Sequence, residues 1–204
     1  MSQKVLDKIT KSVDYDIRIL VLDIALANTG WCIYEFSSKN FKFRIRNCDT
    51  IITDTSGDRP SRIRLILSKI SELIIVNNIN CVIVEEPPQT IFGKGKAAFF
   101  KGRAASVFSV VAACYSVIGF CYARGIFCRE IHPKQWQEIP KGADSKAWSL
   151  QQAKKIFDYL KYNKKISKSE DNHLADAVCI GIRVIKNFTN KKWIIPSLIE
   201  LSHE

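Results

Sequence analysis

The sequence predicts one α/β domain built on a mixed β-sheet. The segments Ile17–Asp23 and Asn80–Glu85 each contain an apolar, β-branched run that ends at an acidic residue, as buried strands do. A helix-like segment lies between them and supplies the crossover that parallel strands require. The 204 residues suffice for one such domain, and no linker rich in Pro, Gly or Ser divides them.

Two further strands follow the first and form an antiparallel meander with it. We predict them at Gly30–Phe36 and Phe41–Ile52, joined by a short polar turn. The loop after them ends at Pro60, a residue type common at helix starts. Apolar residues then recur at helical spacing in 62–77, so we expect a helix with one buried face there.

The second half of the chain alternates helices with a short strand. The uncharged run 104–123 is predicted to be a helix buried in the core or in a subunit interface. A membrane span is disfavoured because serines, tyrosines and a glycine interrupt it and basic residues flank both ends. A strand at 125–131, a loop at 132–144, a helix at 145–160 and a last helix from 169 to about 186 complete the prediction.

Charge and cysteine usage narrow the class of protein. The net charge of +11 and a pI of about 9.4 favour a polyanionic partner, although charge alone does not separate nucleic acid from an anionic membrane surface. Seven cysteines without a Cys-x-x-Cys pair suit buried thiols in a reducing compartment. The charged segment 1–16 does not resemble a secretory signal. We therefore expect an intracellular protein, cytoplasmic or organellar, with 1–16 as an extension and 189–204 as a tail.

Three acids and a histidine come from elements that the predicted sheet brings to one edge. Asp23 and Glu85 end two parallel strands, and the carboxyl edge of an open α/β sheet is where ligands bind. His173 and Asp176 lie three residues apart and share a helix face. Carboxylates with one imidazole suit Mg²⁺ or Mn²⁺. Such ions would activate water to hydrolyse a phosphodiester.

Each of these residues also has a purely structural interpretation. Asp23 could cap the turn that follows it, and Glu85 with Glu86 could form the solvated end of a strand. Asp171 fits a first-turn acid favoured by the helix dipole, and His173 could be a hydrogen-bonded helix residue. Their joint occurrence in this order favours the metal site over the separate structural roles.

Three blocks of this sequence resemble the RuvC-type Holliday junction resolvases, which share the ribonuclease H fold. They are LVLDIALANTGW around Asp23, VIVEEPP around Glu85, and HLADAVCIGI, which contains Asp176. The long uncharged helix and the basic segment before the last helix are similar as well. The resemblance covers about 17–185 and implies a five-stranded ribonuclease H-like sheet flanked by helices, in one nuclease domain at 17–188.

The resemblance implies a homodimeric endonuclease that nicks opposing strands of a four-way DNA junction, with two Mg²⁺ or Mn²⁺ ions per active site. The catalytic and metal-binding residues that it implies are Asp23, Glu85, His173 and Asp176. Many members of the family have an aspartate where His173 stands and some have histidine, so the resemblance is consistent with activity and implies a shifted metal preference. Glu86 is a rival for Glu85, and Asp171 for His173. The helix 98–123 would form the dimer interface.

The resemblance also implies DNA contacts around this site. The family's junction-opening aromatic lies a few residues after the catalytic Glu, but here two prolines intervene and Phe92 is the nearest aromatic. Lys146 corresponds to a lysine near the scissile phosphate, with Lys141 as a second candidate; a solvated lysine at a helix start is the structural alternative. The other phosphate contacts that we expect are Lys94, Lys96, Lys101 and Arg103.

Three rival functions stay open from the sequence. Actin-like sugar kinases also begin with a strand that ends in an acidic residue and is followed by a Thr-Gly turn. They need further glycine-rich loops to bind ATP, and the nine glycines of this chain, with no Gly-Gly pair, disfavour that class. We therefore expect no nucleotide cofactor, and no membrane partner. A non-catalytic protein that binds branched DNA, with vestigial acids, is the second rival. A flap, fork or broader branched-DNA endonuclease of the same fold is the third.

Overall fold

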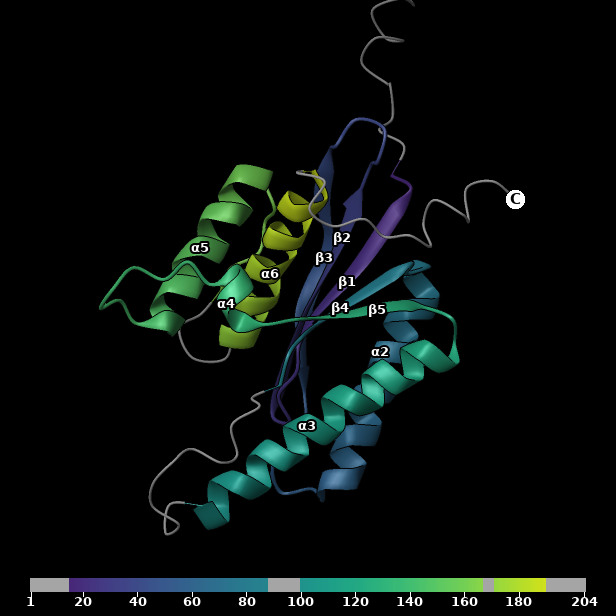
Figure 1. The fold of residues 1–204 in the computed structure, drawn as a ribbon, viewed down its shortest axis with the longest axis vertical. Helices are drawn as coiled ribbons and strands as arrows, with labels where there is room; N and C mark the ends of the chain where they lie inside the picture. Colours follow the sequence, from purple (N-terminus) through teal and green to yellow (C-terminus); the bar gives the residue numbers. More distant parts are fainter. Residues whose placement is uncertain (1–14, 88–99, 167–170, 190–204) are drawn as a thin grey trace, which may run out of the picture.

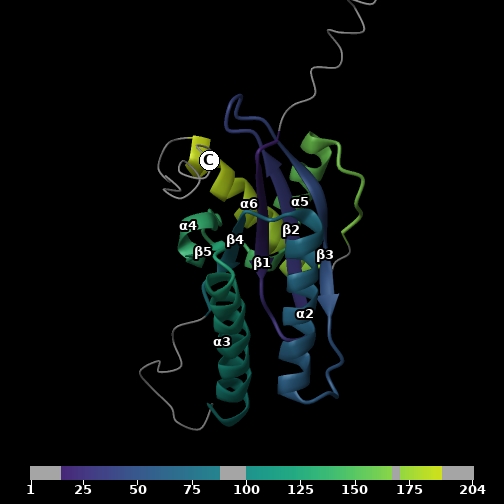
Figure 2. The ribbon, with the colours of Figure 1, turned by 90° about the vertical axis from the view of Figure 1, so that its right-hand side faces the viewer.

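The chain forms a five-stranded mixed sheet, and helices pack on both faces of it (Figure 1). The structure is a computed structural model that describes residues 15–87, 100–166 and 171–189. The strand order is β3-β2-β1-β4-β5. Helices α2 and α3 cover one face, and α4, α5 and α6 lie on the other, as the turned view shows (Figure 2). The predicted fold class is confirmed.

The first three strands form the predicted antiparallel meander. They are β1 (Ile17–Asp23), β2 (Asn28–Phe36) and β3 (Phe43–Ile52). β2 begins two residues earlier than predicted because its ladder with β3 extends to the Asn28–Ile52 pair. β3 begins two residues later than predicted because Phe41 adopts a left-handed conformation, with φ of 56°, in the tight turn.

The crossover that follows makes the next strands parallel. Helix α2 (Arg59–Asn77) starts earlier than predicted, because the side chain of Asp58 accepts a hydrogen bond from the backbone N–H of Ser61 and caps it. β4 (Cys81–Glu85) then pairs in parallel with β1, and β5 (Phe127–Ile131) pairs in parallel with β4. The expected parallel arrangement of the two acid-ending strands is therefore confirmed.

Four helices complete the described chain. They are α3 (Phe100–Ala123), α4 (Pro133–Trp136), α5 (Ser145–Leu160) and α6 (Asn172–Thr189). The prediction of an uninterrupted loop over 132–144 was wrong, since α4 lies within it. A reciprocal pair of hydrogen bonds between His132 and Gln135 caps this short helix. Among the described residues, no helix has the length and apolar character needed to cross a membrane.

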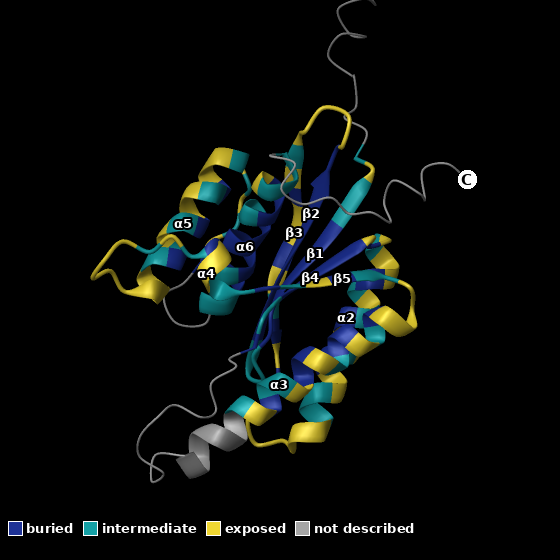
Figure 3. Cartoon of the chain, viewed as in Figure 1, coloured by how far each residue is buried: buried dark blue, intermediate teal, exposed yellow. Residues whose placement is uncertain are grey.

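The alternation of side chains along β1 decides which face receives its acid. Leu20 and Leu22 pack under α2 and α3, whereas Ile19 and Val21 pack under α6. Asp23 continues the second set, so its carboxylate lies on the α6 side. Figure 3 shows the strands buried between the two helical layers. All seven cysteines are buried and free, as the sequence indicated.

Helix α6 approaches β2 so closely that two glycines are required. A Cβ on Gly30 would lie 2.1 Å from the backbone carbonyl carbon of His173, and a Cβ on Gly181 would lie 2.0 Å from the ring of Tyr34. The Tyr34 hydroxyl donates a hydrogen bond to the carbonyl of Val178 over 2.8 Å. These contacts fix the first turn of α6 beside the carboxyl end of β1, because Gly30 pairs with Asp23 in the sheet.

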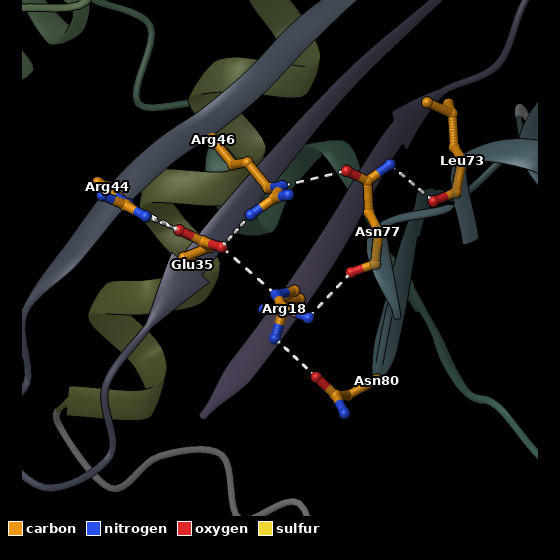
Figure 4. Close-up of polar contacts among 7 residues, drawn as sticks. All are labelled: Arg18, Glu35, Arg44, Arg46, Leu73, Asn77 and Asn80. Atoms are coloured by element: carbon orange, nitrogen blue, oxygen red, sulfur yellow. Dashed lines mark hydrogen bonds and ion pairs between the residues drawn. The ribbon is translucent and has the colours of Figure 1, made fainter. Parts of the chain in front are cut away.

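At the other end of the meander, one buried carboxylate holds three arginines (Figure 4). Glu35 is 2% exposed and accepts hydrogen bonds from Arg18, Arg44 and Arg46, with the last two at 2.7 Å. Arg18 and Arg46 also bond Asn77 at the end of α2. Burial opposes ionisation of Glu35, but its bonds to Arg44 and Arg46 outweigh this and lower its pKa. The cluster joins β1, β2, β3 and α2.

We predict that Glu35→Gln lowers the free energy of unfolding by about 3 kcal/mol, because three partly desolvated guanidinium groups lose their counter-charge. Urea denaturation at pH 7 measures this. Glu72→Gln is the matched control: Glu72 forms an exposed pair with Lys69, so its loss should cost less than about 1 kcal/mol. Equal losses in the two variants would contradict the stabilising role of the cluster.

Candidate active site

The ends of two neighbouring strands bring Asp23 and Glu85 together. Asp23 is the last residue of β1 and is buried, and Glu85 is the last residue of β4. Since the strands are parallel neighbours, both carboxyl groups lie at the same edge of the sheet. The negative charge of Asp23 acts on Glu85, so the two carboxyl groups face each other at this edge.

The first turn of α6 adds the histidine and the third acid. His173 Nδ1 lies 2.6 Å from Asp23 Oδ2, which joins helix and strand directly. The charge of Asp176, three residues later, acts on Glu85 and on His173, so it faces the same group of side chains. The four residues predicted from the sequence therefore lie side by side, although they come from three elements far apart in the chain.

Strand alternation separates Glu85 from its rival Glu86. The charge of Glu86 acts on Glu130 and Tyr115, which belong to β5 and α3, rather than on the acids at the strand end. Its backbone N–H continues the sheet by donating to the carbonyl of Ile131. Glu85 is thus the glutamate that faces Asp23.

Burial of the acids and repulsion between their charges raise the pKa values of Glu85 and Asp176. Burial raises the pKa of Glu85, and the charge of Asp23 adds to this, so that the pKa reaches about 10. Burial, again with Asp23, raises the pKa of Asp176 to about 7. Burial opposes protonation of His173, but its hydrogen bond to Asp23 outweighs that effect and raises the pKa of the imidazole. Acids that carry protons at neutral pH are poised to exchange them for a cation.

One buried carboxylate oxygen, Oδ1 of Asp176, bears on whether these residues could bind a cation. Asp176 Oδ1 is buried and lacks a hydrogen-bond partner among the described residues, so a bound ion would satisfy it. As the side chains stand, however, no three His, Cys, Asp or Glu side chains in the described part of the chain are arranged to hold a metal ion together. His173 occupies Asp23 Oδ2 instead. Three carboxylates and one imidazole are nonetheless a donor set whose chemistry suits a divalent cation.

Two further residues contact the acids and were not predicted from the sequence. Trp136 in α4 donates an indole N–H hydrogen bond to Glu85 Oε1 over 3.2 Å. Ser149, buried on α5, lies near Asp176 and opposes the rise in its pKa, although its Oγ has no hydrogen-bond partner of good geometry in the described chain. The His132-Pro-Lys-Gln135 capping pattern was the signal that could have placed Trp136 on a helix.

The expected DNA contacts are placed only in part. Lys146 is exposed in the first turn of α5, and its charge acts on both His173 and Asp176. Lys141 is exposed in the loop before that helix. Phe92, Lys94 and Lys96 lie outside the described residues. Lys101 and Arg103 belong to the first turn of α3, but their side chains also lie outside what the structure describes.

Comparison with solved structures identifies the fold. RuvC from Thermus thermophilus superposes with a TM-score of 0.58 over 85% of this chain and 97% of its own, at 18% identity. A fowlpox virus resolvase in complex with Holliday junction DNA gives a TM-score of 0.57 at 16% identity, over 84% of this chain and 99% of its own. The yeast mitochondrial resolvase Ydc2 gives 0.55 at 15% identity, covering 90% and 84%.

These likenesses show that the chain has the ribonuclease H-like fold of the RuvC-type resolvases. No protein-family model matches the sequence, and a search of curated proteins found no match. The likeness to these resolvases is thus a likeness of fold, over 84% to 90% of this chain.

We predict that the metal-free protein loses stability as pH rises, and that Asp176→Asn removes part of this loss. Between about pH 4 and pH 7 the folded state keeps the Asp176 proton that the unfolded chain releases, so ionisation opposes folding. Denaturation in EDTA at pH 5 and pH 8 should show a smaller drop for the variant, by roughly 2 kcal/mol. An identical drop in both proteins would contradict the raised pKa.

Proposed function

We propose that this protein is a metal-dependent endonuclease that resolves four-way DNA junctions by paired nicks. The observation that carries the proposal is the gathering of Asp23, Glu85 and Asp176 at the carboxyl edge of a resolvase-like sheet. Fold neighbours whose titles name Holliday junction substrates support the choice of DNA. The net charge of +11 is consistent with a phosphate-rich substrate.

The three acids would hold two Mg²⁺ or Mn²⁺ ions, with His173 beside them. When bound, such ions activate a water molecule and stabilise the leaving oxygen of the phosphodiester. Within the chain, His173 Nδ1 lies 2.6 Å from Asp23 Oδ2, so the imidazole stands beside the acids, where it would hold or move a proton. Trp136 donates a hydrogen bond to Glu85, and Lys146 would provide positive charge at the rim for the phosphate.

A repeating stripe on α3 supports a homodimer. Its inner face packs in the core, whereas Phe108, Ala112, Tyr115, Gly119 and Tyr122 are exposed. Their spacing alternates between four and three residues, the 3.5-residue period by which two helices pack side by side. Small residues alternate with aromatic ones, so the aromatic rings of a second copy have space to enter. Two copies of α3 would cover this apolar stripe.

The main experiment compares cleavage of a four-way junction with cleavage of a linear duplex of the same sequence, in Mg²⁺ and in Mn²⁺. We expect the junction alone to be cut, and Asp23→Asn to lower the rate by at least about 100-fold. Asp158→Asn, which changes an exposed acid on α5, is the control and should cut normally.

Other outcomes of this experiment would select the rival functions. Similar cutting of flaps, forks and four-way junctions would indicate a broader branched-DNA endonuclease. Junction binding without nicking at saturating Mn²⁺ would indicate a DNA-binding protein whose acids are vestigial. Undiminished cutting by Asp23→Asn would exclude this active site.

Ala112→Glu tests the dimer separately. A charge within the apolar stripe should convert the dimer into a monomer at micromolar concentration, measured by light scattering after gel filtration. The melting temperature at a concentration where both proteins are monomeric should hardly change, because position 112 is exposed on one chain. The control is Gln151→Glu on the exposed side of α5. A dimer that persists in Ala112→Glu would place the interface elsewhere.

A further inference from the structure

Helix α4 holds one tryptophan against the carboxyl edge of the sheet, where Glu85 lies. It follows β5 with only His132 between them, and both a capping box and Pro133 at its first position fix its start. Trp136, its last residue, is 3% exposed, and its indole N–H reaches Glu85 Oε1 over 3.2 Å. The helix is too short to persist by itself, so its orientation depends on what it packs against.

Helix α6 supplies that support through one arginine. Arg183 Nε donates to the carbonyl oxygen of Gln135 over 2.9 Å, and its Nη1 donates to Glu138 Oε1 over 2.8 Å. Both acceptors flank Trp136 in the chain. Arg183 also stands seven residues after Asp176, so the two side chains lie on the same side of α6, two turns apart. Figures 1 and 2 show α4 lying against α6.

These contacts form a continuous path between two acids. It leads from Asp176 along α6 to Arg183, across to α4, and through Trp136 to Glu85 on β4. The indole N–H bonds Oε1 of Glu85, which leaves Oε2 as the oxygen of this carboxyl group that a cation would contact.

We propose that Trp136 and Arg183 are positioning residues, which together hold Glu85 in the orientation that a divalent cation requires. The inference rests on the proposed function, because it concerns the same metal-binding acids. Neither side chain touches the reacting atoms. Partners that hydrogen-bond metal-ligating carboxylates fix the orientation of those ligands, and losing one weakens metal binding by about tenfold or more.

The experiment measures Mn²⁺ binding by calorimetry in the full-length protein without DNA. Trp136→Phe keeps an aromatic ring in the core but removes the N–H donor, and Arg183→Gln removes the guanidinium bonds from a partly exposed position. We expect each variant to bind Mn²⁺ about tenfold more weakly. Because both act along one path, the double variant should be far less than 100-fold weaker. Cleavage by each variant should recover at higher Mn²⁺, whereas junction affinity in EDTA should not change.

Trp148→Phe is the matched control. Trp148 lies with Trp136 and Arg183 around the same hollow of about 170 Å³ between α4, α5 and α6, so its replacement reports loss of packing alone. Wild-type Mn²⁺ affinity in both single variants would overturn the inference and leave the proposed nuclease intact. Multiplicative losses would overturn the shared path. A wild-type protein that binds no Mn²⁺ would overturn the metal site, and this inference with it.

Discussion

The packing of α6 on β2 is the constraint on which the candidate active site depends. At Gly30 there is no room for even one methyl group between the strand and the backbone of His173, and Gly181 is equally tight against Tyr34. Because Gly30 pairs with Asp23, this contact sets the distance between the β1 acid and the first turn of α6. Small shifts here would separate side chains that must act together, while leaving the hydrophobic core largely intact.

The chain treats its buried carboxylates in two opposite ways. Glu35 is surrounded by three arginines, so its charge is stabilised and helps to join strands and helix. Asp23, Glu85 and Asp176 lie beside a histidine and an indole N–H, with Lys146 at the rim, and the charge of Asp23 raises the pKa of both other acids. Grouping these acids with less counter-charge than Glu35 has costs stability, and that cost is what a cation would offset.

Much of this arrangement follows from local sequence signals. The acids at the ends of β1 and β4, and the three-residue spacing of His173 and Asp176, could be recognised because strand ends and helix faces are local properties. Trp136 could not, since its bond to Glu85 spans 51 residues and depends on how α4 meets α6. The short helix itself was missed because capping, rather than apolar periodicity, defines it. Phe92, Lys94 and Lys96 lie outside the described residues and remain predictions.

The stripe on α3 has a consequence for how mutations would act in the proposed dimer. An interface that uses the same surface on both copies is isologous, so a twofold axis passes through it and residues near the axis meet their own copies. Each substitution in the stripe is then made twice, and a substitution near the axis contacts its own copy. Such an interface admits no compensation by a change on the other partner, because the partner carries the same gene product. Small residues such as Gly119 suit such an interface. A glycine leaves space for an aromatic ring of the other copy, and it does not clash with its own copy.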